Sequence, residues 1–155
     1  MTLRIRAAEH EDLEVVVALN HALFQEDAGQ RDPYMNLNWA QEEGRAYFAR
    51  HLGSKTSHCL VAELSGEVVG YLVGYTQEAN SLRLAPEATL ESMFVRQAFR
   101  SHDVGQQLFD GFLVWCRERE MQRVSVTAYV ANEGAIRFYQ HAGFRPASLT
   151  LERSP

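Results

Sequence analysis

The residues best suited to chemistry lie between Thr89 and Phe109, where a short apolar run leads into a polar turn. Residues 90–95 are rich in strand-forming types and carry one carboxylate, Glu91. The turn at residues 96–103 holds two arginines and a histidine, and from Val104 the apolar residues recur at helical spacings of three and four. The first N–H groups of a helix lack internal partners, and the helix dipole favours negative charge there. The stretch therefore predicts an anion site, with a phosphorylated ligand as the first expectation.

Strand–loop–helix units also occur in many α/β domains whose loops bind nothing, and this turn matches neither a Walker-type nor a dinucleotide-binding glycine pattern. The stretch does resemble the cofactor-binding motif of the GNAT acyltransferase superfamily, in which a strand ending in valine runs into Arg/Gln-x-x-Gly-x-Gly/Ala. Here the matching residues run from Arg100 to Gly105, and Asp103 stands in place of the first glycine. A carboxylate at this point competes with phosphate for the positive pole of the helix. Asp103 is equally explained as an N-cap for the helix that begins at Val104.

A second motif resembles the C-terminal signature of the same superfamily. It reads Asn132-x-x-Ala135-x-x-Phe138-Tyr139-x-x-x-Gly143-Phe144. Asn132 is also a good helix N-cap, and Gly143 suits a left-handed helix end. The two motifs stand in the expected order and at the expected separation, so the resemblance spans nearly the whole chain.

The elements that position these motifs follow from the hydrophobic pattern. Helices are expected at residues 8–24, 39–52 and 104–120, with a short one from Asn132 to Gly143. A polar loop covers residues 25–38, and residues 65–67 have the composition of a hairpin turn. Strands are expected at residues 3–6, 58–64, 68–75, 90–95, 124–130 and 145–153. This order predicts a single domain over residues 1–155 of the α/β (α+β) class. With the resemblance, it predicts the GNAT fold, a mixed and mostly antiparallel sheet flanked by helices.

The composition is that of an ordinary globular domain, with 155 residues, 46% of them apolar and 23% charged. A net charge of −5 does not favour binding to nucleic acid, which is itself negatively charged. No apolar run approaches the length of a membrane span. No signal peptide is recognisable, so a cytoplasmic location is expected. The six histidines lack metal-ligand spacing, so no metal is expected. Cys59 and Cys116 lie among apolar residues, which predicts free buried thiols.

The resemblance implies that the protein binds acetyl-CoA and transfers its acetyl group directly to an amine in a ternary complex. It places the pantetheine arm along the backbone of Phe94 and Val95, on a strand splayed from the one that carries Val130. A backbone N–H near Phe94 then polarises the thioester carbonyl, and Asn132 contacts the pantetheine. The pyrophosphate is expected on the turn that opens the central helix, formed by Arg100, Ser101, His102, Asp103, Val104, Gly105 and Gln106.

Acetyl transfer to an amine needs one group to accept a proton and another to donate one. An ammonium with a pKa near 10.4 costs roughly 4.6 kcal/mol to deprotonate at pH 7, and a carboxylate can take that proton. Glu91 occupies a position where the superfamily often carries this base; it is otherwise a carboxylate at the rim of the sheet or in an ion pair. Tyr139 matches the tyrosine that faces the CoA sulfur and acts as general acid; it is otherwise a core residue with a hydrated hydroxyl.

The acceptor is the least determined part of the prediction. In this fold the first two helices and their loop cover the acceptor side, where Glu26, Asp27, Tyr34 and Trp39 provide acidic and aromatic groups for a cation. The same residues are equally typical of a solvated loop and helix face. Polyamines, aminoglycoside-like compounds, amino acids and peptide N-termini all remain open. Two other functions also remain: a sensor that binds CoA or a metabolite without turnover, and a structural domain. A homodimer is compatible with the fold, although nothing in the sequence establishes it.

Overall fold

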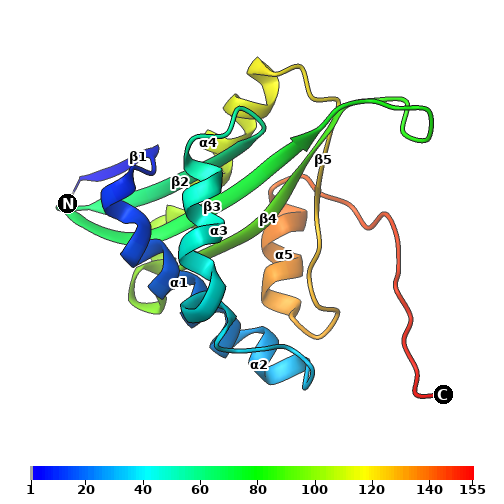
Figure 1. The fold of residues 1–155 in the computed structure, drawn as a ribbon, viewed down its shortest axis with the longest axis horizontal. Coiled ribbons are helices and arrows are strands. Elements are labelled where there is room, and N and C mark those ends of the chain that lie inside the picture. Colours follow the sequence, from blue (N-terminus) through cyan, green and yellow to red (C-terminus); the bar gives the residue numbers. More distant parts are fainter. Residues whose placement is uncertain (1) are drawn as a thin grey trace.

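The computed structural model describes residues 2–155 and shows a twisted sheet with helices on both faces (Figure 1). The strands are β1 (Leu3–Ala7), β2 (Ser57–Leu64), β3 (Glu67–Gln77), β4 (Glu87–Val95) and β5 (Arg123–Val126). They lie in the order β1-β2-β3-β4-β5; neighbours are antiparallel except for β4 and β5, which are parallel. This is the mixed, mostly antiparallel sheet that we predicted.

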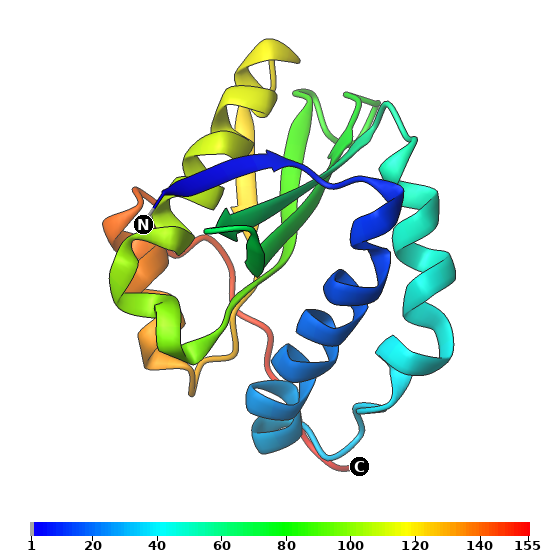
Figure 2. The ribbon, with the colours of Figure 1, turned by 90° about the vertical axis from the view of Figure 1, so that its left-hand side faces the viewer.

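The helices divide between the two faces of the sheet (Figure 2). One face carries α1 (Leu13–Glu26) and α3 (Arg45–Leu52), and the other carries α4 (Val104–Glu118) and α5 (Glu133–His141). Residues 25–38, which we expected to form a loop, include the short helix α2 (Ala28–Arg31). A π-helical turn, Ala40–Gly44, precedes α3, and 3-10 turns at His10–Asp12 and Gln97–His102 precede α1 and α4. None of the helices within residues 2–155 combines the length and apolar character needed to cross a membrane.

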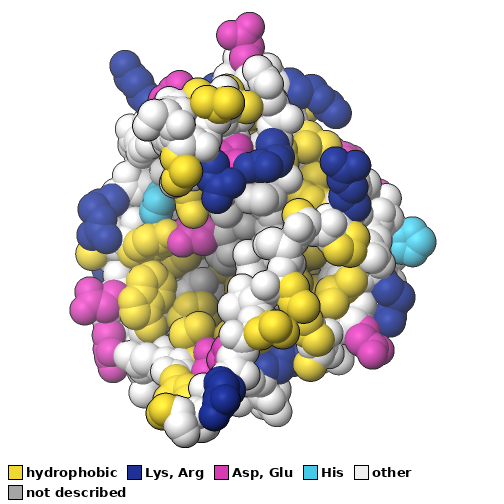
Figure 3. All heavy atoms as spheres, turned by 90° about the vertical axis from the view of Figure 1, so that its right-hand side faces the viewer, with side chains coloured by type: hydrophobic (Ala, Val, Ile, Leu, Met, Phe, Trp, Pro, Cys, Tyr) yellow, Lys and Arg dark blue, Asp and Glu magenta, His cyan; other side chains and the backbone are white. Residues whose placement is uncertain are grey.

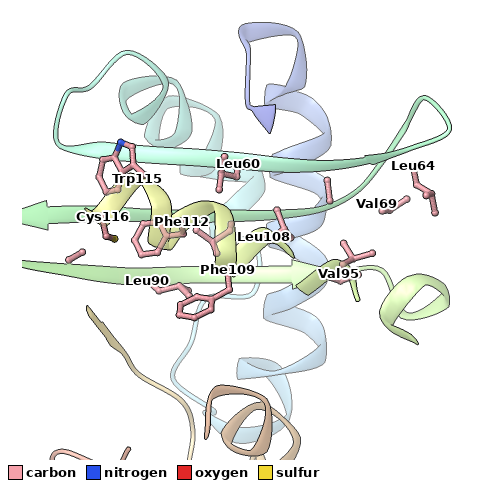
Figure 4. Close-up of a cluster of buried hydrophobic side chains, with 14 residues drawn as sticks. Leu60, Leu64, Val69, Leu90, Val95, Leu108, Phe109, Phe112, Trp115 and Cys116 are labelled. Carbon is pink, nitrogen blue, oxygen red and sulfur yellow. The ribbon is translucent and has the colours of Figure 1, made fainter. Parts of the chain in front are cut away.

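Alternating side chains of the strands form two apolar clusters, one on each face. On the α4 face, Leu60, Leu72 and Leu90 of the sheet meet Leu108 and Phe112 (Figure 4). On the α1 and α3 face, Val61, Tyr71 and Val73 meet Leu19 and Phe48. The buried cysteines Cys59 and Cys116 belong to different clusters and are free, as predicted.

The largest departure from the predicted elements is at the C-terminus. Residues 145–153 were expected to form a strand, but this prediction is wrong for the chain as described: residues 144–155 form no regular structure. β5 is also shorter than the expected 124–130, and Val130 is 75% exposed. Both differences share one physical reason, because a strand forms only where its backbone groups can pair. β4 pairs with β5 only as far as Val126, and within residues 2–155 neither residues 127–130 nor residues 145–153 have another strand beside them.

A charged cluster ties the first strand to the start of α1. Asp12 is 7% exposed and accepts hydrogen bonds from both terminal nitrogens of Arg6, at 2.7 and 3.0 Å, and from the N–H of Glu9 at 2.7 Å. The Nε group of Arg6 donates to Glu63 on β2 at 2.8 Å. The hydrogen bonds from Arg6 hold the pKa of Asp12 below its usual value, against the opposing effect of burial.

Asp12→Asn is expected to lower the free energy of unfolding by about 1–3 kcal/mol at neutral pH, because Arg6 loses a charged, hydrogen-bonded partner. A depressed carboxyl pKa in the folded state stabilises the fold at pH values above the unfolded pKa, and this stabilisation is lost as pH falls through the folded value. The difference in the free energy of unfolding between the natural chain and the variant should therefore shrink below pH 4 or so. Urea unfolding across this pH range measures it. Glu14→Gln, which removes a 76% exposed partner of Arg45, is the control and should change little; a deficit that did not depend on pH would contradict the ionic explanation.

Candidate active site

The central strand separates from its parallel neighbour halfway along its length. β4 pairs with β5 only from Glu87 to Leu90, opposite residues 123–126, whereas on its other side it stays paired with β3 as far as Val95. Among residues 2–155, the backbone of residues 91–95 therefore has no strand partner on the side towards β5. An extended ligand can pair with such an edge as an added strand does. Figure 3 shows that this side of the molecule is hollowed, with hydrophobic and acidic side chains around the hollow.

Glu91 lies where the two strands begin to separate, and a β-bulge positions it. In the pairing of β3 with β4, Val73 faces Ser92 and Gly74 faces Leu90, so Glu91 is the extra residue. A bulge re-aims the side chain that it carries. Gly74 is required opposite the bulge, because a Cβ at this position would lie 2.4 Å from the Phe112 ring and 2.7 Å from the carbonyl oxygen of Thr89. The Glu91 side chain is exposed and accepts a hydrogen bond from the hydroxyl of Tyr47 on α3.

Aromatic side chains of the α3 region form a wall beside Glu91. The Tyr47 ring is 5.2 Å from Trp39 and 4.4 Å from His51, between ring centroids, and Trp39 is 5.9 Å from Phe24. Burial, followed by the hydrogen bond and charge of Glu91, raises the pKa of Tyr47. Burial lowers the pKa of His51, although the charge of Glu91 opposes it. At neutral pH Tyr47 is thus a hydrogen-bond donor to Glu91, and His51 is uncharged.

The turn that we predicted to bind an anion directly precedes α4, but its geometry differs from that of a simple loop. Residues 97–102 form a 3-10 turn, and Asp103 follows with φ 62° and ψ 17°, in the left-handed region. Glycine adopts this conformation without steric cost, which explains why the superfamily motif has glycine here; Asp is among the few other residues that tolerate it. Our alternative explanation, that Asp103 caps α4, is not supported, because its side chain makes no capping hydrogen bond.

Arg100 is held within the protein in this structure. Its two terminal nitrogens donate to both carboxylate oxygens of Glu26 at 2.6 and 2.7 Å, and its Nε donates to the Val95 carbonyl at 2.8 Å. The guanidinium also lies 5.1 Å from the Phe94 ring centroid. This arrangement joins the end of α1 to the end of β4. It engages Glu26, which we expected to contact the acceptor, and the carbonyl of Val95, which we expected to contact pantetheine.

The remaining residues of the turn point in different directions. Ser101 and Asp103 are exposed, and Val104 is fully buried in the core beneath the start of the helix. His102 lines a hollow with Leu3 and Leu64, over the β1 and β2 side of the sheet rather than beside β5.

The first turn of α4 has backbone N–H groups without partners in the helix, and its small residue Gly105 leaves room for α5. A Cβ on Gly105 would lie 3.4 Å from the Phe138 ring. This small residue allows the two helices to approach. The Gln106 side chain donates to Asp110 at 2.9 Å, so it follows the helix surface, and only its backbone N–H remains available at the helix start.

Asn132 and Tyr139 come from α5, on the far side of the separated strands. Asn132 caps the helix as predicted, because its Oδ1 accepts from the Ala135 N–H at 3.1 Å, and its Nδ2 donates to Asp27 at 3.0 Å. Tyr139 packs edge-on against Phe144 with ring centroids 5.5 Å apart. Burial, together with the charge of Asp27, raises the pKa of Tyr139 to about 12, so its hydroxyl stays protonated at neutral pH.

The expected acceptor residues fall into two groups. Trp39 belongs to the aromatic wall beside Glu91, whereas Tyr34 is 94% exposed. Glu26 and Asp27 bind Arg100 and Asn132 respectively and so link the end of α1 to the turn and to α5.

Tyr47 and His51 are the residues that sequence reasoning missed. The signal was present, since Trp39, Glu43, Tyr47 and His51 recur every fourth residue and share one helix face.

The two motifs, the separated strands and the order of elements agree with one known family. The model of the acetyltransferase (GNAT) family matches residues 16–144. This chain belongs to the acetyltransferase (GNAT) family. The resemblance inferred from the two motifs is thereby confirmed, as is the predicted fold class.

Individual relatives of this GNAT chain are distant. It is 24% identical over 136 residues to the spore coat polysaccharide biosynthesis protein SpsD of Bacillus subtilis, covering 88% of this chain but only 45% of SpsD. It is 25% identical to an N-alpha-acetyltransferase of Sulfurisphaera tokodaii, covering 94% of this chain and 82% of the relative. The aminoglycoside N-acetyltransferase AAC(6')-Iy, in complex with CoA, has the same fold with a TM-score of 0.78 at 18% identity, over 99% and 95% of the two chains.

Proposed function

We propose that this GNAT protein binds acetyl-CoA and transfers the acetyl group to a primary amine of a small molecule, by direct attack in a ternary complex. The observation that carries the proposal is the unpaired edge of β4 at residues 91–95, with Glu91 at one end and the opening of α4 at the other. The pantetheine arm would pair with this edge through Phe94 and Val95. The pyrophosphate would lie on the N–H groups that open α4. The family match and the CoA complex of a structural neighbour support this choice of cofactor.

The arrangement supports direct transfer, with a proton acceptor on one side of the thioester and a proton donor on the other. Glu91 and the wall of Trp39, Tyr47 and His51 stand on the α3 side, where an amine cation can meet a carboxylate and aromatic faces. Tyr139 stands on the α5 side with a protonated hydroxyl. Glu91 first accepts a proton from the ammonium group, directly or through water, and the neutral nitrogen then attacks the thioester carbonyl. As the C–S bond breaks, Tyr139 donates its proton to the departing sulfur, and the second proton that the nitrogen loses returns to the tyrosine oxygen through water.

The choice of a small acceptor rests on the wall and on the fold neighbours. AAC(6')-Iy is an aminoglycoside N-acetyltransferase. The relative from Sulfurisphaera tokodaii carries the name N-alpha-acetyltransferase, which makes a peptide N-terminus the second candidate acceptor. Thiol release from acetyl-CoA, measured with polyamines, aminoglycosides, amino acids and short peptides, separates these candidates. Release with none of them, despite tight binding of acetyl-CoA, would favour the sensor function instead.

Acetyl-CoA binding is tested by calorimetric titration of the natural chain and of Asp103→Gly. We expect micromolar binding by the natural chain and about tenfold tighter binding by the variant, because a negative charge leaves the positive end of α4. Asp103→Asn removes the charge but keeps a side chain on a residue whose backbone is left-handed. An equal increase in acetyl-CoA affinity in both variants would therefore assign the effect to the charge. Asp110→Asn removes a charge farther along α4 and should leave the affinity unchanged. If neither the natural chain nor Asp103→Gly binds acetyl-CoA, the proposed function is wrong.

A further inference from the structure

The β-bulge of β4 places two successive polar side chains on the same face of the sheet. Successive residues of a strand point to opposite faces, so Leu90 and Phe94 would share a face if β4 were regular. Instead, Leu90 belongs to the apolar cluster on the α4 face and Phe94 to the cluster on the α1 and α3 face, because the bulge adds a residue between them. Glu91 points away from the face of Leu90. Ser92 points to the same face as Phe94, so both polar side chains lie on the α1 and α3 side.

Hydrogen bonds on this face agree with that arrangement. Tyr47 of α3 donates to Glu91, and the hydroxyl of Ser92 lies 2.9 Å from that of Tyr71 on β3. The ring centroid of Phe48 is 5.3 Å from that of Tyr47 and 6.0 Å from that of Tyr71, so the two hydrogen bonds lie in one region. Tyr71 is fully buried, whereas Ser92 is half-buried. Ser92 is thus the outer end of a polar contact that begins in the core.

A buried chain of hydrogen bonds fixes the direction of the Ser92 hydroxyl. Asn20 of α1, which is 3% exposed, donates from Nδ2 to the Tyr71 hydroxyl at 2.8 Å. Within residues 2–155, Ser92 is the remaining partner of that hydroxyl, and a buried O–H without an acceptor is costly, so Tyr71 donates its proton to Ser92. Burial raises the pKa of Tyr71, which keeps this proton in place at neutral pH. Since a serine hydroxyl can donate once and accept twice, Ser92 retains one lone pair and its own proton for other partners.

Stability alone does not account for this chain. The Oδ1 atom of Asn20 is buried and has no hydrogen-bond partner within residues 2–155. An unpartnered buried polar atom costs free energy, whereas apolar groups of the same shape can replace two polar partners at little cost. The polar chain is explained if its outer end, Ser92, has a task beside Glu91.

We propose that Ser92 binds the acetyl-accepting amine and makes the site selective for primary amines. This inference rests on the proposed acetyltransferase function and adds a residue to its amine side. Once Glu91 has taken one proton, a primary amine keeps two N–H groups. One donates to the free lone pair of Ser92 and the other to the carboxyl group of Glu91, so the nitrogen lone pair points away from both, towards the thioester on the edge of β4. Ser92 itself makes and breaks no covalent bond; it orients the nucleophile.

The selectivity follows from the number of N–H groups. A secondary amine that has lost a proton keeps only one N–H group, so it can donate to Ser92 or to Glu91 but not to both. A site that is organised for two hydrogen bonds discriminates against a substrate that makes only one, because a polar group of the site is left unpaired. The preference for primary amines should therefore depend on the Ser92 hydroxyl.

Thiol release at saturating acetyl-CoA tests the proposal. The probes are the primary amine that the natural chain acetylates fastest among polyamines, aminoglycosides, amino acids and short peptides, and the same compound methylated at the reacting nitrogen. Ser92→Ala should lower kcat/KM for the primary amine about tenfold, mostly through a higher KM, because one hydrogen bond to the nitrogen is lost. It should change kcat/KM little for the methylated compound and leave acetyl-CoA affinity, measured by calorimetry, unchanged. Ser92→Thr keeps the hydroxyl and should restore most of the activity.

Two further variants separate this role from a structural one. Ser125→Ala is the matched control, since its hydroxyl lies 3.5 Å from that of Thr89, where β4 and β5 are still paired, and it should change neither kcat nor KM. The double variant Asn20→Leu, Tyr71→Phe replaces the buried chain by apolar side chains. It should melt close to the temperature of the natural chain and still raise the KM for the primary amine, because the hydroxyl of Ser92 is no longer held in one direction.

The outcomes distinguish this inference from the function on which it rests. If the natural chain turns over but Ser92→Ala leaves kcat/KM for the primary amine unchanged, Ser92 does not bind the amine. An equal loss with the primary and the methylated amine also overturns the proposal, since it would indicate a structural role. Neither result touches the acetyltransferase function. A natural chain that releases no thiol with any amine contradicts the acetyltransferase function itself, and the role of Ser92 falls with it.

Discussion

Glu91→Gln is expected to lower kcat at neutral pH about 100-fold while leaving acetyl-CoA binding unchanged. The reason is chemical, because the amide cannot accept the ammonium proton although it has nearly the same shape as the carboxylate. Its oxygen can still accept the hydrogen bond from Tyr47, so the β-bulge and the wall should keep their geometry. The measurement is thiol release at saturating amine, together with calorimetric titration of acetyl-CoA.

The pH dependence distinguishes a lost proton acceptor from a lost contact. The fraction of uncharged amine rises about tenfold per pH unit until the pH approaches the amine pKa, near 10.4. The kcat of a variant without a base depends on this fraction. The ratio of the natural kcat to that of Glu91→Gln should therefore fall steadily as pH rises from 7 to 9 or so. A deficit that stays constant with pH would mean that Glu91 positions the amine cation instead of removing its proton. An unchanged kcat at pH 7 would exclude Glu91 from the chemistry.

Tyr47→Phe is the matched control for this experiment. It removes the donor to Glu91 but leaves the carboxylate and the aromatic ring in place. A modest loss of kcat, far smaller than that of Glu91→Gln, is expected because only the orientation of the carboxylate changes. A loss as large as that of Glu91→Gln would show that the hydroxyl itself takes part in the proton transfer.

The parts of the fold that could be predicted are those fixed by local signals. The hydrophobic pattern located four of the strands and α4, and the Ser65–Gly66 turn has positive φ angles of 51° and 86°, as expected for a tight hairpin. Asn132 and Gly143 were recognisable as helix ends from their residue types alone, and both act as predicted. The family motifs then supplied the type of sheet, mixed and mostly antiparallel, which local patterns do not contain.

The parts that could not be predicted depend on contacts between distant residues. Arg100 is of a residue type that often binds phosphate, yet its guanidinium forms an ion pair with Glu26, which lies 74 positions away in the sequence. Glu91 was recognisable as a candidate base, but its residue type does not reveal the bulge opposite Gly74, which places it in an exposed position beside Tyr47. Residues 145–153 have the alternation of a strand but no strand partner within residues 2–155, and whether an extended segment becomes a strand is decided by its neighbours.

Tyr139→Phe is expected to reduce kcat about 30-fold with little change in the KM for acetyl-CoA. A thiolate with a pKa near 8.5 is a better leaving group than most, so protonating it matters less than deprotonating the amine. The raised pKa of Tyr139, about 12, keeps the phenol protonated across the neutral range, so the variant should keep the shape of the natural pH–rate profile below pH 9 or so.

The competing explanation is that Tyr139 only packs against Phe144, just after the end of α5. Packing alone would leave kcat intact, because phenylalanine preserves the ring, and any loss would then appear as lower thermal stability. Tyr129→Phe is the control, since burial and the charges of Asp32 and Asp27 also raise the pKa of this tyrosine, but it lies on the segment after β5 rather than on α5. A similar loss of kcat in both variants would indicate a general effect of removing a hydroxyl near Asp27. A loss confined to Tyr139→Phe would assign the donor role to the one hydroxyl that the family motif places beside the sulfur.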